Sequence, residues 1–157
     1  MDEKRIAEAV ERAVRGSVVR SVTPQQAHKL AQAVRCRARE MGVKAVVAVS
    51  DAHGNPLLCE AEEDSYLASW DIALQKSYTV VALKMSTKKL AELAAPGGEL
   101  YGIQFTNGGK IVIFGGGEPL ERNGKIVGGL GVSGGSAEQD TALAEYGGQI
   151  FKEICGC

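Results

Sequence analysis

The sequence predicts an α+β fold in which helices flank an antiparallel sheet. Two capping boxes, Thr23-Pro24-Gln25-Gln26 and Ser136-Ala137-Glu138-Gln139, each open a segment with helical spacing of apolar residues. Between them, short apolar runs alternate with turn residues. Asn123-Gly124 is the dipeptide that best tolerates the two positive φ angles of a type I′ hairpin turn. Strands joined by hairpins and flanked by helices form an antiparallel sheet.

Residues 1–15 are expected to form a separate amphipathic helix. Its apolar residues recur at helical spacing with charges on the other face, namely Ile6, Ala9, Val10, Ala13 and Val14. A helix of about fifteen residues is marginal alone in water, so it either docks on its own domain or on a partner, or the terminus is partly disordered. Residues 16–22 are interpreted as a linker, and residues 23–157 as the main domain.

The first half of this domain is predicted to contain two helices around a hairpin. The helix opened by Thr23 ends near Gly42. The β-branched run Ala45–Val49 is typical of a central strand, and the turn residues Asp51–Asn55 lead into a returning strand over 56–59. Residues 60–64 are an acidic break, after which a helix runs from Ser65 to about Lys84.

The second half is expected to hold shorter elements. They are, in order, a helix over 88–94 capped by Thr87, a weak strand over 101–105, a strand over Lys110–Phe114, hairpin strands over 120–122 and 125–132, and the Ser136 helix. Gly129–Gly134 matches the dinucleotide-binding pattern G-x-G-x-x-G. That fingerprint needs a second parallel strand after its helix, and no such strand fits between about Ile154 and Cys157. We therefore expect no Rossmann unit, and no P-loop motif occurs.

Composition favours one globular, cytoplasmic domain. The 157 residues are 45% hydrophobic and 24% charged, and the net charge of -1 gives no reason to expect nucleic acid or an anionic membrane as a partner. No apolar run approaches the roughly 20 residues of a membrane span, and the N-terminus does not resemble a secretory signal. The four cysteines form no regular framework, so reduced thiols are expected.

Four ordered motifs resemble the GlcG/HbpS-type haem-binding family, whose domain also forms the C-terminal part of PduO-type cobalamin adenosyltransferases. The motifs span about residues 23–151 and are Ala48-Val49-Ser50-Asp51-Ala52-His53-Gly54-Asn55-Pro56, Asp71-Ile72-Ala73-Leu74-Gln75-Lys76-Ser77-Tyr78-Thr79, Gly115-Gly116-Gly117-Glu118-Pro119-Leu120, and Gly128-Gly129-Leu130-Gly131-Val132-Ser133-Gly134 with Glu138-Gln139-Asp140. The resemblance implies a profilin-like fold, a homo-oligomer, and binding of haem or, second, of a corrinoid. Activity is poorly settled within this family, so the resemblance decides neither for nor against an enzyme.

Residues 1–15 lie outside this resemblance. Their pattern is similar to the helices that direct enzymes into bacterial microcompartments, and PduO-type domains belong to such compartments. The resemblance therefore implies a haem-binding accessory protein, linked to corrinoid or redox maintenance, housed in a microcompartment. Residues 1–15 would contact shell or cargo proteins.

His28 is the first candidate for an axial haem ligand, because imidazole commonly ligates haem iron and the chain has only two histidines. His28 borders the buried side of its helix, whereas His53 lies in a turn that Asn or Asp would fill equally well. Cys36, eight positions after His28, is the reserve ligand. Cys155-Gly156-Cys157 resembles a two-thiolate metal hook, and a frayed reduced tail is the favoured reading.

Lys76 is the second candidate. It lies beside the apolar face of its helix, where it could face Gly131, Ser133, Gly134 and Gly135 and hold a carboxylate such as a haem propionate. Three aspartates, Asp51, Asp64 and Asp71, could also gather near it. Two alternatives stay open: an enzyme acting on a small metabolite in a pocket of Lys76, Asp51 and Gly131–Gly135, or a structural accessory protein without a ligand.

Overall fold

The computed structural model describes residues 2–17 and 20–155 and confirms the α+β class. Its elements are, in chain order, α1 (Glu3–Ser17), α2 (Pro24–Glu40), β1 (Val46–Asp51), β2 (Pro56–Ala61), α3 (Leu67–Leu83), α4 (Thr87–Leu93), the 3-10 turns η1 (Ile103–Phe105) and η2 (Asn107–Gly109), β3 (Gly117–Arg122), β4 (Lys125–Ser133) and α5 (Ala137–Ile154). The expected order of helices and hairpins is confirmed, with element ends that differ by a few residues.

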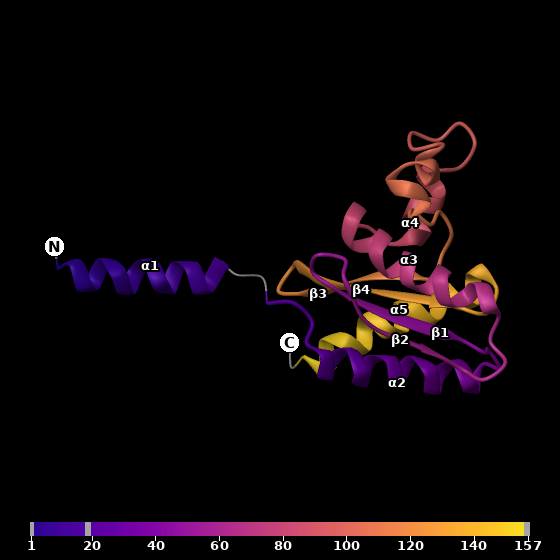
Figure 1. Cartoon of the computed structure of the whole chain (residues 1–157), viewed down its shortest axis with the longest axis horizontal. Coiled ribbons are helices and arrows are strands. Elements are labelled where there is room, and N and C mark those ends of the chain that lie inside the picture. The colour runs from indigo at the N-terminus through magenta and orange to yellow at the C-terminus, as the bar shows by residue number, and fades with distance from the viewer. Residues whose placement is uncertain (1, 18–19, 156–157) are drawn as a thin grey trace.

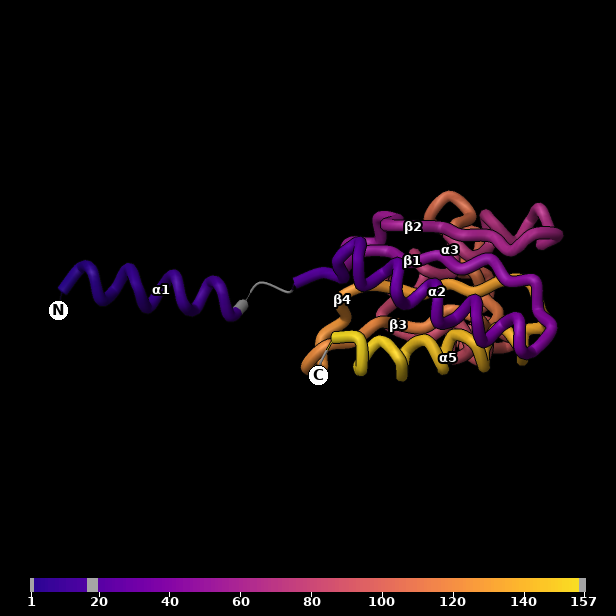
Figure 2. Tube along the Cα trace, turned by 90° about the horizontal axis from the view of Figure 1, so that it is seen from below, coloured from indigo at the N-terminus to yellow at the C-terminus, as the bar shows by residue number. Residues whose placement is uncertain are grey.

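The four strands form one sheet in the order β2-β1-β4-β3, and every neighbouring pair is antiparallel. Helices α2 and α5 cover one face of this sheet, and α3 covers the other (Figures 1 and 2). The antiparallel order confirms that the glycine pattern in β4 does not belong to a Rossmann unit, which requires parallel strands.

Both capping boxes and the Asn123-Gly124 turn form as predicted, whereas the N-cap of α4 is Ser86 and not Thr87. Both capping boxes are formed: Thr23 accepts from the N–H of Gln26 at 3.2 Å while the Gln26 side chain accepts from the N–H of Thr23, and Ser136 and Gln139 make the same exchange. Asn123 and Gly124 adopt φ angles of 51° and 72°, as a type I′ turn requires.

The main apolar core lies between the sheet and the helices α2 and α5, where Leu30, Val34, Leu130, Leu143 and Phe151 are fully buried. The other face is packed differently. A Cβ atom at Gly129 would overlap the carbonyl oxygen of Ser77, and one at Gly131 would overlap that of Ala73. Glycine in β4 therefore lets the backbone of α3 lie directly on the strand.

Two strand predictions are wrong. Lys110–Phe114 is irregular, although Ile111 and Val112 are buried. This segment runs beside α3, where the Thr79 hydroxyl accepts from the N–H of Val112 at 3.1 Å and donates to the carbonyl of Lys110 at 3.3 Å. The apolar run is buried as expected, but its backbone bonds to the Thr79 side chain and not to a neighbouring strand. Residues 101–105 form turns, including η1, instead of a weak strand.

Helix α1 stands apart from the sheet and the other helices (Figures 1 and 2). Its Ile6, Val10 and Val14 side chains are 46%, 56% and 54% exposed. Residues 18 and 19 of the expected linker lie outside the described residues, as do Gly156 and Cys157 of the expected thiolate hook. Within 2–17 and 20–155, no helix combines the length and apolar character needed to cross a membrane.

Candidate functional site

His28 lies in the second turn of α2, beside the edge strand β2. Its Nδ1 atom is 3.0 Å from Oε1 of Glu60, and its side chain is 56% exposed. Position 27 points into the core and position 28 turns towards β2, so the imidazole stands at the border of the buried stripe, as the sequence indicated. No residue in the part of the chain that the structure describes forms a hydrogen bond with Nε2 of His28, so this nitrogen is available to a ligand.

Glu60 belongs to a row of ion pairs that joins α2 to β2. Arg35 donates to Oε2 of Glu60 at 2.8 Å and lies 3.4 Å from Glu62. Arg39 donates twice to Glu62, at 3.0 Å each. The hydrogen bond from Arg39, despite some burial, holds the pKa of Glu62 below its ordinary value. This row, His28–Glu60–Arg35–Glu62–Arg39, is called the α2–β2 ladder below.

The other two candidate iron ligands are placed as follows. His53 lies in the β1–β2 turn, where its backbone N–H donates to Oδ1 of Asp51 at 2.8 Å, so Asp51 forms an Asx-turn. Cys36 is exposed on α2. Eight helical residues separate it from His28, or about 12 Å along the axis, so the two side chains of one chain do not reach the same iron.

Lys76 faces the end of β4, as the sequence predicted, but it is completely buried. Its ammonium donates to the carbonyl of Val132 at 2.7 Å and to Oδ2 of Asp140 at 3.1 Å, and lies 4.9 Å from the centre of the Phe114 ring. Burial lowers the pKa of Lys76, and the Asp140 carboxylate opposes this change. Because these partners are internal, the ammonium is not presented to a bound carboxylate in this arrangement.

Asp140 occupies the anion position at the start of α5. Its Oδ1 accepts from the N–H of Gly135 at 2.9 Å while its Oδ2 pairs with Lys76. Burial raises the pKa of Asp140, and both Lys76 and the Gly135 amide act in the opposite direction. The N-terminus of α5 is thus occupied by the helix's own carboxylate.

The remaining residues of the expected Lys76 site make contacts elsewhere in the fold. Ser133 donates to Ser69 at 3.1 Å, and Gly134 has a φ of 149° and packs on the backbone of Lys44. Asp71 accepts from Gln75. Asp51 lies opposite Gly128, near the other end of β4 from Val132, so the structure does not assemble the expected pocket of Lys76, Asp51 and Gly131–Gly135.

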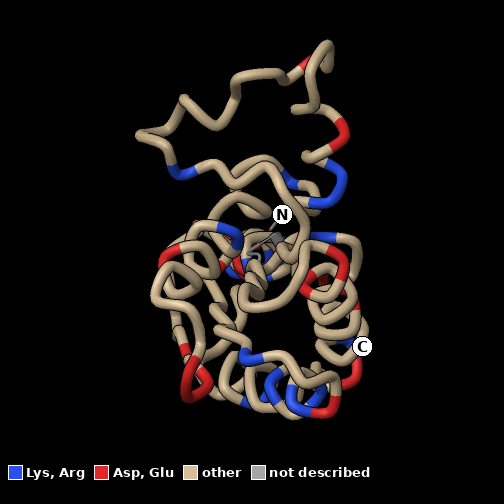
Figure 3. Tube along the Cα trace, turned by 90° about the vertical axis from the view of Figure 1, so that its right-hand side faces the viewer, with Lys and Arg blue, Asp and Glu red and all other residues tan. Residues whose placement is uncertain are grey.

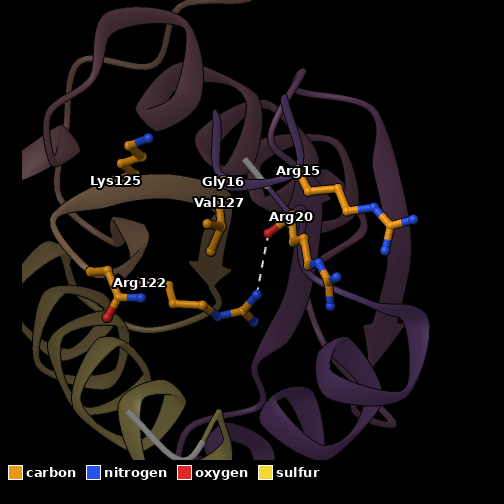
Figure 4. Close-up of a pocket in the computed structure, with 7 residues that line it drawn as sticks. Arg15, Gly16, Arg20, Arg122, Lys125 and Val127 are labelled. Atoms are coloured by element: carbon orange, nitrogen blue, oxygen red, sulfur yellow. Dashed lines mark hydrogen bonds between the residues drawn. The ribbon is translucent and has the colours of Figure 1, made fainter. Parts of the chain in front are cut away.

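Cavities lined by described residues lie away from both candidates. The cavity in Figure 4 has a volume of about 380 Å³ and lies beside the β3–β4 hairpin, lined by Arg15, Gly16, Arg20, Arg122, Asn123, Lys125 and Val127. Arg122 points across it and donates to the carbonyl of Arg20 at 3.3 Å. A second cavity, of about 230 Å³, lies between the β1–β2 turn and α3 beside Tyr78 and Lys110. Neither includes His28 or Lys76.

Glu60 and Asp140 are the partners that sequence reasoning missed. The sequence holds a signal for the first: acidic residues alternate at 60 and 62, which places them on one face of a strand, and Arg35 and Arg39 recur one helical turn apart. The signal for Asp140 is weaker, namely a carboxylate four residues after the N-cap Ser136. Figure 3 shows cationic and anionic residues interspersed along the trace, which fits such local pairing.

Comparison with known proteins identifies relatives over most of the chain. The chain is 44% identical over 136 residues to an uncharacterized 15.0 kDa protein from the dhaT-dhaS intergenic region of Citrobacter freundii, covering 87% of this chain and 96% of that protein. It is 40% identical over 146 residues to the corrinoid adenosyltransferase PduO of the same organism, covering 90% of this chain. The chain spans only 44% of that PduO protein.

Two solved structures are also similar. Protein ORFY of Klebsiella pneumoniae has a TM-score of 0.84 and 38% identity, with 87% of this chain and 94% of that chain covered. A structure described as the PduOC:heme complex has a TM-score of 0.78 and 39% identity, with 82% and 94% covered. A family model described as "Haem degrading protein HbpS-like" matches residues 22–149, so α1 lies outside the match. The chain therefore belongs to the HbpS-like family.

Proposed function

We propose that this chain binds haem, with His28 as an axial ligand of the iron. The observation that carries the proposal is the exposed imidazole whose Nδ1 is held by Glu60 and whose Nε2 is open to a ligand. Imidazole is a common axial ligand, and bound haem would supply iron-centred redox chemistry. The HbpS-like family match and the likeness to the PduOC:heme complex support the same ligand.

The open surroundings of His28 are suited to a haem that is shared between subunits. The imidazole stands on an open surface, and the cavities described above lie elsewhere. A haem on His28 of one chain alone would leave most of its apolar ring in water, which is unfavourable. We therefore infer that a second copy covers the other side of the ring, so that the ligand site lies at a subunit contact.

Exposed apolar residues support a homo-oligomer. Leu67, at the start of α3, is 95% exposed, with Tyr66 at 73% and Trp70 at 47% beside it. The segment after α4 projects away from the sheet, as Figure 1 shows, and carries Tyr101 and Phe105 at 67% and 85% exposure. Apolar groups of this size on a monomer mark interaction surfaces.

Cys36 remains the alternative ligand within this proposal, because it is an exposed thiol on the same helix. A corrinoid is the less favoured ligand. It is suggested by the PduO relatives, but the chain spans less than half of PduO, so adenosyl transfer is not carried over. Lys76 enters the proposal as a support for the fold near β4, since its bonds are internal.

We further propose that α1 directs the protein into a bacterial microcompartment by binding shell or cargo proteins. The exposed stripe of Ile6, Val10 and Val14, on a helix that stands apart from the domain, supports this role. The likeness to PduO relatives is consistent with it.

Haemin titration followed by absorption tests the proposal. A sharp Soret band that saturates at stoichiometric haemin is expected, and His28→Ala should shift its maximum and weaken binding. His53→Ala is the matched control, because His53 lies in an exposed turn and should change neither property. Broad, non-saturating absorbance would refute haem binding, and an unchanged spectrum in His28→Ala would refute the ligand assignment.

A further inference from the structure

Glu60 is held at both of its carboxylate oxygens. Oε1 meets Nδ1 of His28 at 3.0 Å, and Oε2 accepts from Arg35 at 2.8 Å. The side chains of Glu60 and Arg35 are only 24% and 20% exposed, against 56% for His28. The exposed imidazole is therefore held by Glu60, which is itself held by the largely buried side chain of Arg35.

This arrangement fixes the orientation of the carboxylate. His28 and Arg35 are seven positions apart, which is two turns of α2, so both face β2. Glu60 lies opposite Val47 in the sheet and reaches α2 between them. With Arg35 bound to Oε2, the other oxygen, Oε1, is directed at the imidazole.

The contact also assigns the proton on the neutral imidazole. An ionised carboxylate only accepts hydrogen bonds, so Nδ1 must carry the hydrogen and Nε2 must carry the lone pair. That tautomer is the one that binds a metal through Nε2. Carboxylates that accept from the second nitrogen of a metal-bound histidine orient the ring and raise its basicity.

We propose that Glu60, clamped by Arg35, is the positioning residue that holds His28 in the orientation and tautomer needed to bind haem iron. This inference rests on the proposed function, because it takes His28 as the iron ligand. It adds a role for the α2–β2 ladder, whose first pair would serve the ligand while the remaining pairs fasten α2 to β2.

Glu62 supplies a matched control. It pairs with Arg35 at 3.4 Å and with Arg39 at 3.0 Å, so its loss weakens the same junction of α2 and β2. It has no contact with His28 in the part of the chain that the structure describes. If the ladder only stabilises the fold, Glu60→Gln and Glu62→Gln should have similar effects on the His28 tautomer and on haemin affinity. If Glu60 positions His28, only Glu60→Gln should change them.

The first measurement needs no haem. In the ¹⁵N-labelled haem-free protein at about pH 8.5, NMR should find the neutral imidazole of His28 with its proton on Nδ1. In Glu60→Gln the new amide should give its oxygen to Arg35, which only donates, and its N–H₂ to Nδ1, so the proton should move to Nε2. In Glu62→Gln the tautomer should stay as in the unchanged protein.

The second measurement is haemin binding. Glu60→Gln should bind haemin about 10- to 100-fold more weakly and raise the reduction potential of the bound haem, whereas Glu62→Gln should do neither. The inference is overturned if the two variants behave alike in tautomer and in haemin affinity while His28→Ala still shifts the Soret band. If His28→Ala leaves that band unchanged, the proposed ligand and this inference fall together. If no variant of the chain binds haemin, haem binding itself is refuted.

Discussion

The ammonium nitrogen of Lys76 lies 3.1 Å from Oδ2 of Asp140, although 64 residues separate them along the chain. The Lys76 side chain is fully buried and that of Asp140 is 5% exposed. The same carboxylate accepts from the N–H of Gly135, and the same ammonium donates to the carbonyl of Val132. The pair therefore ties α3, the end of β4 and the start of α5 to one point.

Breaking this pair from one side should destabilise the fold strongly. Lys76→Met leaves a buried carboxylate without its cation, so we expect a loss of about 3–5 kcal/mol in the free energy of unfolding by urea. Lys76→Met combined with Asp140→Leu should cost less than the sum of the single changes. Lys88→Met is the control: its pair with Glu145 is 2.9 Å long but 59% and 46% exposed, so the loss should be much smaller than for Lys76→Met. Equal losses in the two single lysine variants would contradict the structural role of the buried pair.

Gly131→Ala should separate α3 from β4. The added methyl group would overlap the backbone oxygen of Ala73, and the backbone of a helix cannot give way as a flexible side chain can. A loss of about 1–3 kcal/mol or more in unfolding free energy is expected from overpacking of this kind. Gly16→Ala, where nothing lies within 4 Å of the new Cβ, should leave the domain's stability unchanged. A neutral Gly131→Ala would show that glycine is not required for this contact.

The Glu62 pairs should make part of the stability depend on acid. The pKa of Glu62 is lowered in the folded protein by the hydrogen bond from Arg39. Its contribution is therefore fully present above its ordinary pKa of about 4.5 and is lost as the pH falls through the lowered value. Glu62→Gln should be less stable than the unchanged protein by up to about 1 kcal/mol at pH 7, and the difference should shrink steadily as the pH is lowered below about 4.5. Glu63→Gln, at an exposed neighbouring position, should show no such difference at any of these pH values.

The exposed apolar residues should hold subunits together. Light scattering at micromolar concentration should report a mass well above that of the 16.5 kDa chain. Leu67→Glu combined with Phe105→Glu should lower this mass without loss of helical circular dichroism, because both side chains are exposed in the single chain. Lys44→Glu, an exposed charge change between α2 and β1, should leave the mass unchanged. A monomer in the unchanged protein would remove the shared-haem arrangement.

Deleting residues 1–15 should leave the melting temperature of the domain within a few degrees, because α1 stands apart from it. The same deletion should abolish co-localisation with microcompartment shell proteins. Ile6→Glu combined with Val10→Glu should have the same effect on co-localisation, whereas Glu8→Gln on the polar face should not. A large fall in melting temperature would show that α1 belongs to the core.

The elements that could be predicted depend on neighbours in the sequence. A capping box needs only four residues, and a type I′ turn needs only Asn123 and Gly124, so these local signals were sufficient. Lys110–Phe114 shows the limit of such signals. An apolar run indicates burial, but whether it pairs with a strand depends on what lies beside it, and here that neighbour is Thr79 of α3.

The candidate site likewise has one part that could be predicted from neighbouring residues in the sequence and one part that could not. Helical periodicity alone was enough to predict that His28 borders the buried stripe of α2 and that Lys76 lies beside the apolar face of α3, because it fixes which face of a helix a side chain occupies. Their partners, Glu60 and Asp140, lie 32 and 64 residues away and are brought to them by the packing of the folded chain. An ion pair acts over a few ångströms, and which carboxylate comes that close depends on how the elements pack, which no short stretch of sequence specifies.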